Sequence, residues 1–199
     1  FPIRCIVPPL SYFSMGWIVP DENRAAIDQA DFITKHLEST SLPTGHGFKQ
    51  DNLTQGTAYW VADPESGLPI RLIALDTIAP MGSEGILSRE QIDDFLVPEL
   101  QRAKDDKMLV ILLTHHPSIE ILRGSEMRGI LHQNPHVILH LVGHNHRHEI
   151  TPRTGDTPEQ GYWEIQTASL IDWPLQQRIL EVVNLGNGVG EIWSTVIDF

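Results

Sequence analysis

The sequence has a single cysteine, Cys5, among its 199 residues. One cysteine cannot form a disulfide within the chain, and it excludes a zinc site built from several cysteines. Apolar runs are short as well: none approaches the roughly 18 residues of a membrane-spanning helix, and the N-terminus lacks the pattern of a signal peptide. The chain begins with Phe1 rather than Met, so we expect that residues upstream can have been removed. These absences predict a soluble protein without a membrane partner, and its compartment stays open.

Positive charge is also scarce. The chain has 14 basic and 26 acidic residues, which gives a formal net charge of −12. This balance argues against electrostatic capture of nucleic acid or of anionic membranes. A small phosphorylated substrate remains compatible with it, because a bound metal ion supplies positive charge locally. Hydrophobic residues at 41% and charged residues at 20% are typical of an ordinary globular domain with a core of its own.

The stretch His136–Glu149, HVILHLVGHNHRHE, is the most informative in the chain. Its apolar run, residues 137–142, predicts a buried strand that Gly143 ends. We expect this glycine to turn the backbone tightly enough for His144 and His146 to reach one metal cluster. The alternative is a loop with several exposed histidines. His140 within the run is interpreted as a core histidine with its hydrogen bonds satisfied, and His148 as solvent-facing or as orienting a neighbour.

A second histidine group follows another predicted strand. Met108–Leu113 is a nearly continuous apolar run, as in strands that are buried on both faces, and Thr114-His115-His116-Pro117 comes directly after it. A short helix is predicted between the two strands, over residues 126–133. A strand, a helix and a strand in succession favour parallel neighbours joined by a right-handed crossover. The sequence therefore predicts that His115 lies near His144 and His146, which strengthens the case for a metal site.

The remaining helices and strands are predicted from the periodicity of hydrophobic residues and from turn-forming residues. Asp21–Ser39 has helical spacing, Ser88 opens a helix with a capping box that Pro98 should kink or interrupt, and Ser41–Gln55 is expected to be a polar loop that contains His46. The prolines of residues 1–20 disfavour a long helix or a central strand there. The other predicted strands form a hairpin in the first half of the chain and an antiparallel group in the second: residues 57–62, 70–75, 147–151, 162–167, 178–184 and 191–197.

Several of these motifs carry a resemblance to a known family. THHP at residues 114–117 and GHNH at residues 143–146, each after an apolar strand and in this order, resemble the last two metal motifs of the calcineurin-like metallophosphoesterases. LIALDT at residues 72–77 resembles a strand of that family. The closing segment, residues 162–182, is similar to a bacterial subgroup. The resemblance covers residues 57–199, whereas residues 1–56 match poorly.

This resemblance implies a binuclear metal centre on an α/β sandwich, with a metal-bound hydroxide that attacks phosphorus. By motif position, His115 and His144 would ligate one metal and His146 the other, and His116 would be second to the ligands or face the substrate. An equally weighted alternative packs His116 beside Pro117. The ions would be Mn, Fe or Zn, two in the complete family site, and the substrate a small phosphorylated molecule, monoester or diester.

The chain also departs from the family. It has no Asp-x-His; its only Gly-Asp, Gly155-Asp156, lies in a polar loop after the histidines; and its only Asn-His, Asn145-His146, is part of the last motif. The family's carboxylate ligands and its catalytic histidine motif therefore have no counterpart, and we expect at most one bound ion here. Either these residues are part of a longer chain that supplies the missing ligands, or the protein is naturally short. In the second case it would be a non-catalytic metal-binding or scaffold module.

For the fold, the sequence predicts a single, partial α/β domain, residues 1–199. Its mixed sheet would be flanked by helices, its C-terminal strands would be antiparallel, and the whole would form the C-terminal half of a metallophosphoesterase-type sandwich. A half-sandwich leaves apolar surface uncovered. We therefore expect marginal stability or self-association of the chain.

Overall fold

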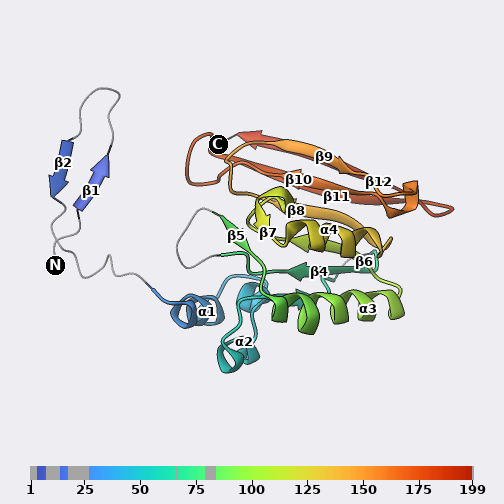
Figure 1. Ribbon diagram of the computed structural model, residues 1–199, viewed down its shortest axis with the longest axis horizontal. Helices are drawn as coiled ribbons and strands as arrows, with labels where there is room; N and C mark the ends of the chain where they lie inside the picture. The colour runs from blue at the N-terminus through green and yellow to red at the C-terminus, as the bar shows by residue number, and fades with distance from the viewer. Residues whose placement is uncertain (1–3, 8–13, 18–26, 66, 79–83, 199) are drawn as a thin grey trace.

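The computed structural model describes residues 4–7, 14–17, 27–65, 67–78 and 84–198, and Figure 1 shows their arrangement. At its centre is a six-stranded sheet with the strand order β3-β4-β6-β8-β10-β9. The central strands β4, β6, β8 and β10 are parallel, and the outer strands β3 and β9 are antiparallel to their neighbours. The strands are β3 (Trp60–Ala62), β4 (Ile70–Ala74), β6 (Leu109–Leu113), β8 (Val137–Val142), β9 (Glu149–Arg153) and β10 (Tyr162–Gln166).

The two apolar runs that flank the histidine motifs form the middle of this sheet. β6 and β8 are parallel neighbours, with Leu112 opposite His140. Helix α4 (Gly124–His132) crosses between them, as the strand–helix–strand pattern predicts. A register irregularity lies between Val110 and Ile111, opposite Val137 and Leu139. It shifts which side chains of β8 face each side of the sheet, since a single added residue reverses the alternation.

Helices cover one face of the sheet, where the larger core lies (Figure 1). Helix α3 (Val97–Asp105) continues a π-helical segment, η3 (Gln91–Leu96). Proline cannot donate to the preceding turn and its ring collides with the carbonyl four residues back, so a wider π turn just before Pro98 relieves both problems. The helix therefore continues through Pro98 with a π-helical distortion and is not interrupted there. Of the predicted capping box one half is present: Ser88 Oγ accepts from the Gln91 amide at 2.9 Å, whereas the Gln91 side chain bonds the backbone of Asp76.

The opposite face is covered by a hairpin of β11 (Gln176–Gly186) and β12 (Val189–Asp198). Leu180, Val182 and Ile192 of the hairpin pack on a second, smaller core around Leu139 and Ile165. Asn187 and Gly188 both have positive φ, 55° and 76°, as a tight hairpin turn requires. The hairpin is paired with no further strand among the described residues. The prediction of a mixed α/β fold with a mixed sheet flanked by helices is confirmed, and the second layer is this two-stranded hairpin.

The segment before the sheet contains more helix than the sequence predicts. Helix α1 (Gln29–Glu38) is capped by Asp28, whose side chain accepts from the Asp31 amide at 2.8 Å. The prediction of a helix from Asp21 is therefore wrong at Ile27 and Asp28, and residues 21–26 lie outside the described part. The prediction of a polar loop over residues 41–55 is wrong: η2 (Thr44–Gly47) and α2 (Gln50–Gln55) occupy it. Asn52 stabilises α2 because its side chain bonds the backbone at Lys49, Thr57 and Tyr59.

Two further pairs of strands complete the description. β1 (Arg4–Val7) and β2 (Ser14–Trp17) pair antiparallel, and the other residues of the proline-rich opening lie outside the described part. β5 (Gly85–Ile86) and β7 (Ile121–Leu122) pair in parallel, and short turns η4 (Ser118–Glu120) and η5 (Pro158–Gln160) precede β7 and β10. The prediction that the second half is antiparallel holds for β9, β11 and β12, but β10 is parallel to β8. No helix within the described ranges is long and apolar enough to cross a membrane.

Candidate metal centre

The candidate centre lies where three neighbouring parallel strands end. Thr77 follows β4, His115 and His116 follow β6, and His144 follows β8. The carboxyl ends of parallel strands share one edge of the sheet, and ligand sites in open α/β sheets collect beyond that edge. We call residues 114–117, after β6, and residues 143–146, after β8, the two histidine loops. The amide of Gly143 donates to the carbonyl of His115 at 2.8 Å, so these loops continue the pairing of their strands. The predicted convergence of His115 and His144 is therefore present.

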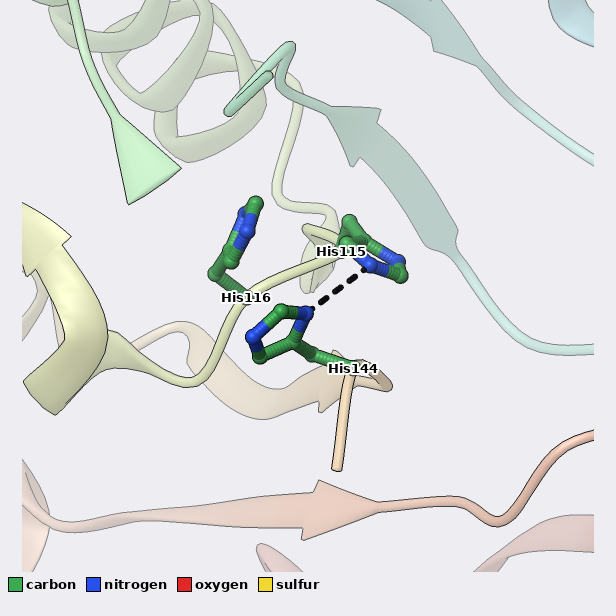
Figure 2. Close-up of side chains that lie close together, drawn as sticks. All are labelled: His115, His116 and His144. Atoms are coloured by element: carbon green, nitrogen blue, oxygen red, sulfur yellow. Dashed lines mark hydrogen bonds between the residues drawn. The ribbon is translucent and has the colours of Figure 1, made fainter. Parts of the chain in front are cut away.

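Three histidines form one group at this edge: His115, His116 and His144 (Figure 2). One ligand atom from each lies within 4.8 Å of the others. The closest approach is between His144 Nδ1 and His115 Nε2, at 3.3 Å. Their rings are nearly perpendicular, at 81°, with centroids 5.2 Å apart. This edge-to-face arrangement brings one nitrogen of His144 next to one nitrogen of His115.

This donor set fits a transition-metal ion. Zinc–imidazole bonds of about 2.0–2.1 Å in a tetrahedral site place neighbouring ligand nitrogens roughly 3.4 Å apart. The 3.3 Å between His144 Nδ1 and His115 Nε2 agrees with that separation, whereas the group of three extends over up to 4.8 Å, so its third imidazole would move closer on binding the same ion. Desolvation, followed by the charges of His144 and His146, lowers the pKa of His115 below the usual histidine value. A lowered pKa keeps the imidazole neutral, which is the form that binds metals.

His116 is the most constrained of the three. Its side chain is only 3% exposed, and its Nδ1 atom lies 2.9 Å from Thr77 Oγ1. Gly85 packs against it so closely that a Cβ at that position would lie 2.8 Å from the imidazole. The sequence analysis predicts that His116 lies beside the ligands or faces the substrate, or alternatively that it packs beside Pro117. The structure buries it and also includes it among the possible ligands.

His146 is placed differently from the other three. It is exposed and lies outside the group formed by His115, His116 and His144, although it is near enough for its charge to lower the pKa of His115. Its assignment to a second ion therefore stays a prediction. The strand β8 ends just before Gly143, as expected, and the left-handed residues of the following loop are His144 and His146, with φ of 75° and 51°. Histidine is one of the non-glycine side chains found more often in left-handed backbone, so this loop can form without a glycine at either position.

The sequence analysis missed a carboxylate beside this group. Glu120 Oε2 lies 3.7 Å from His144 Nε2, and Glu120 Oε1 accepts from Asn145 Nδ2 at 2.8 Å. Histidines that bind metal through one nitrogen usually direct the other toward a carboxylate, which fixes the tautomer. Glu120 is therefore suited to leave Nδ1 of His144 free for an ion. No motif reveals it, because its position depends on the η4 turn after Pro117.

The remaining histidines lie away from the group. His140 is fully buried, and its two nitrogens contact Thr114 Oγ1 and Glu164 Oε2 at 2.8 and 3.0 Å, so its interpretation as a satisfied core histidine is confirmed. The nitrogens of His148 are covered by neighbouring atoms and desolvation lowers its pKa, so the solvent-facing alternative is wrong, and the alternative in which it orients a neighbour stays a prediction. His46 contacts Ser41 Oγ at 2.9 Å, far along the chain from the centre.

Comparison with solved structures finds several similar chains, and one of them is a phosphatase. The chain is similar to the crystal structure of a dimetal phosphatase from Danio rerio, with 13% identity and a TM-score of 0.49. The similarity covers 62% of this chain and 53% of the zebrafish protein, so the chain matches about half the length of that protein. No family model matches the chain. No curated protein matches it either. Membership of a bacterial subgroup stays a prediction.

Proposed function

We propose that the protein takes part in metal-dependent hydrolysis of phosphoesters, with this chain supplying the histidine side of a binuclear centre. The observation that supports it most is the meeting of His115, His116 and His144 at one sheet edge. The two loops that supply these side chains are also the two segments whose sequences, THHP and GHNH, resemble metallophosphoesterase motifs. Sequence resemblance and spatial grouping thus agree on the two loops and on His115 and His144, whereas they differ on His116 and His146.

These residues alone would contribute one part of the reaction, the binding of a metal ion. When bound, a divalent ion lowers the pKa of its water to about 7 and offsets negative charge on phosphoryl oxygens. The three imidazoles would hold the ion, and Glu120 would orient His144 toward it. The substrate would be a small phosphorylated molecule, whose negative charge the acidic surface does not attract, so recognition would depend on the metal itself. The ion would be Mn, Fe or Zn, since imidazole binds each of them.

Metal binding by the purified chain is the direct test. Titration with Zn²⁺ and Mn²⁺, followed by calorimetry, is expected to show a site that His144→Ala abolishes. His36→Ala is the matched control, because His36 lies on α1, with its Nδ1 atom 2.8 Å from the carbonyl of Phe32. Wild-type affinity in His144→Ala would remove the proposal. Hydrolysis of an aryl phosphate, assayed on a chain that also includes any encoded upstream residues, should then depend on added metal and stop with a chelator.

A second candidate is a non-catalytic module that keeps the fold and one metal. It is favoured by the sequence, which lacks the Asp-x-His motif and the bridging carboxylate. A three-histidine site with an open position can hold a single ion without a carboxylate bridge. Metal-dependent turnover of an aryl phosphate by the 199 residues alone would exclude this candidate. Binding of one ion without turnover would favour it.

A further inference from the structure

A buried polar layer lies directly beneath the two histidine loops. Glu164 and Gln166 are on β10, two residues apart and therefore on the same face, and both are about 5% exposed or less. Glu164 is paired with His140 of β8, whose side chain is completely buried. Apolar side chains in place of buried ionic groups are often neutral or stabilising, so the fold alone does not require a carboxylate at this position. These residues call for another explanation.

Glu164 is held as a carboxylate. Its Oε2 atom accepts from His140 Nδ1 at 3.0 Å, and its Oε1 atom accepts from Arg153 Nη2. Desolvation is the largest influence and raises the pKa of Glu164, but hydrogen bonds from His140 and Arg153 outweigh it and bring the pKa down to about 2. A carboxylate only accepts hydrogen bonds, so His140 must carry its proton on Nδ1. The other nitrogen of His140 is then directed at Thr114.

The first histidine loop is tied to this pair at both ends. At its start, Thr114 Oγ1 lies 2.8 Å from His140 Nε2 and donates to the carbonyl of His116 at 2.7 Å. At its end, the amide of Ser118 donates to Glu164 Oε2 at 3.3 Å. The residues between these points include His115 and His116. Their backbone is therefore fixed through the buried His140–Glu164 pair.

The second histidine loop is tied to the same strand by a different residue. Gln166 Nε2 donates to the carbonyl of Gly143 at 2.6 Å, immediately before His144. The amide of Thr167 also donates to the carbonyl of Val142, at 2.9 Å. Two inward-facing side chains of one strand thus reach the two loops whose histidines must meet at one ion.

We infer that Glu164 and Gln166 are positioning residues that align the two histidine loops for a shared metal ion. Glu164 acts through His140 and Thr114 on the loop of His115 and His116, and Gln166 acts on the loop of His144. Neither side chain belongs to the group of possible ligands. This inference rests on the proposed function, because alignment matters only if the histidines bind a metal.

Cobalt binding tests the inference. Co²⁺ is titrated into the purified full chain, and its visible absorption spectrum and affinity are recorded; melting of the metal-free variants is measured separately. Thr114→Val keeps the size of the side chain but loses both hydroxyl contacts, and Thr114→Ser restores the hydroxyl. Removing partners around metal ligands typically costs about 10–100-fold in affinity. We expect a loss of that size and an altered spectrum in Thr114→Val, and wild-type behaviour in Thr114→Ser.

Gln166→Met is the second variant, and it decides the matter alone if Thr114→Val fails to fold. It keeps the length of the side chain but cannot donate to Gly143, so we expect a comparable loss of Co²⁺ affinity. Unchanged affinity and spectrum in both variants, whatever their melting temperatures, would overturn the inference and leave the proposed function standing. A serine variant as weak as the valine variant would also count against it. A wild-type chain that binds no Co²⁺ would instead remove the proposed function, and the inference with it.

Discussion

The Nδ1 atom of His144 lies 3.3 Å from the Nε2 atom of His115, although 29 residues separate the two histidines in the sequence. Two neutral imidazoles can share one hydrogen bond here, with one of the facing nitrogens donating and the other accepting. A shared ion would turn the same geometry into two coordinate bonds. The short distance between the two nitrogens depends on the parallel pairing of β6 and β8. The affinity for an ion would depend on the residues that orient each ring.

Glu120 is expected to support metal binding by orienting His144. Glu120→Gln keeps an oxygen for Asn145 but removes the negative charge that faces His144 Nε2. We expect Zn²⁺ affinity to fall about 10-fold, at the lower end of losses seen for partners of metal ligands. Calorimetry measures it, and Glu149→Gln, which removes the exposed partner of Arg147, is the control. Equal affinities for both variants would contradict the role given to Glu120.

Gly85→Ala is expected to disturb the centre through a single methyl group. The added Cβ would lie 2.8–2.9 Å from atoms of His116, so the ring or the strand β5 must move. Overpacking of this kind costs about 1–3 kcal/mol of unfolding free energy. We expect a lower melting temperature and weaker metal binding.

The control for that variant is Gly129→Ala. Gly129 lies in α4, and a Cβ there meets no atom within 4 Å. Alanine in place of a helical glycine stabilises by roughly 0.5–1 kcal/mol. If both substitutions change the melting temperature alike, the close packing of Gly85 on His116 has no energetic consequence.

The buried Glu164 predicts acid sensitivity. Its pKa is lowered to about 2 in the folded protein, against 4.5 for an ordinary glutamate. A lowered pKa stabilises the fold above the unfolded value, and that contribution, on the order of 3 kcal/mol, is lost as the pH falls through the folded value. Unfolding free energy should therefore decrease between about pH 4.5 and 2. In Glu164→Gln this component of the decrease should be missing, whereas Glu181→Gln, on the exposed hairpin, should leave it in place. Chemical denaturation at a series of pH values measures it, and parallel curves for all three proteins would contradict it.

The outer face of the β11–β12 hairpin is expected to promote self-association. Ile179, Val183 and Trp193 lie opposite the side chains that pack on the core, and they are 46%, 37% and 58% exposed. Unpaired edge strands with exposed apolar side chains tend to associate. Sedimentation should show species larger than a monomer that Trp193→Lys reduces. A compact monomer at every concentration would refute the expectation.

The parts of the fold that the sequence predicts best are those governed by local pattern. Residues 108–113 are apolar throughout and residues 137–142 are apolar except for His140, so both strands are predicted from their own sequence, and the short helix between them predicts their parallel pairing. Helix α2 was missed because its residues are polar, and its stability comes from the contacts of Asn52 with the backbone on both sides of it. The direction of β10 was missed because its strand pattern does not specify which neighbour it joins.

In the candidate site, too, some residues are placed by local sequence pattern and others by long-range packing. His115 and His144 could be placed together because strand ends define their positions, and the sheet edge then determines their distance. The proximity of His116 to them depends on Thr77 and on the small size of Gly85, which come from other parts of the chain. Glu120 depends on a turn whose sequence, SIE, has no distinctive motif. Long-range packing of this kind leaves no local pattern.

The parallel order of β4, β6 and β8 also separates the centre from the turns that enter these strands. The histidine loops leave the carboxyl ends, whereas the segments after α3 and α4, around Lys107 and Asn134, enter at the opposite edge. Surface turns tolerate added residues well, since lengthening a loop costs little entropy. Tags or fluorescent reporters inserted at those two turns should therefore leave His115, His116 and His144 undisturbed. The chain thus has two attachment points on the edge of the sheet opposite the candidate metal centre.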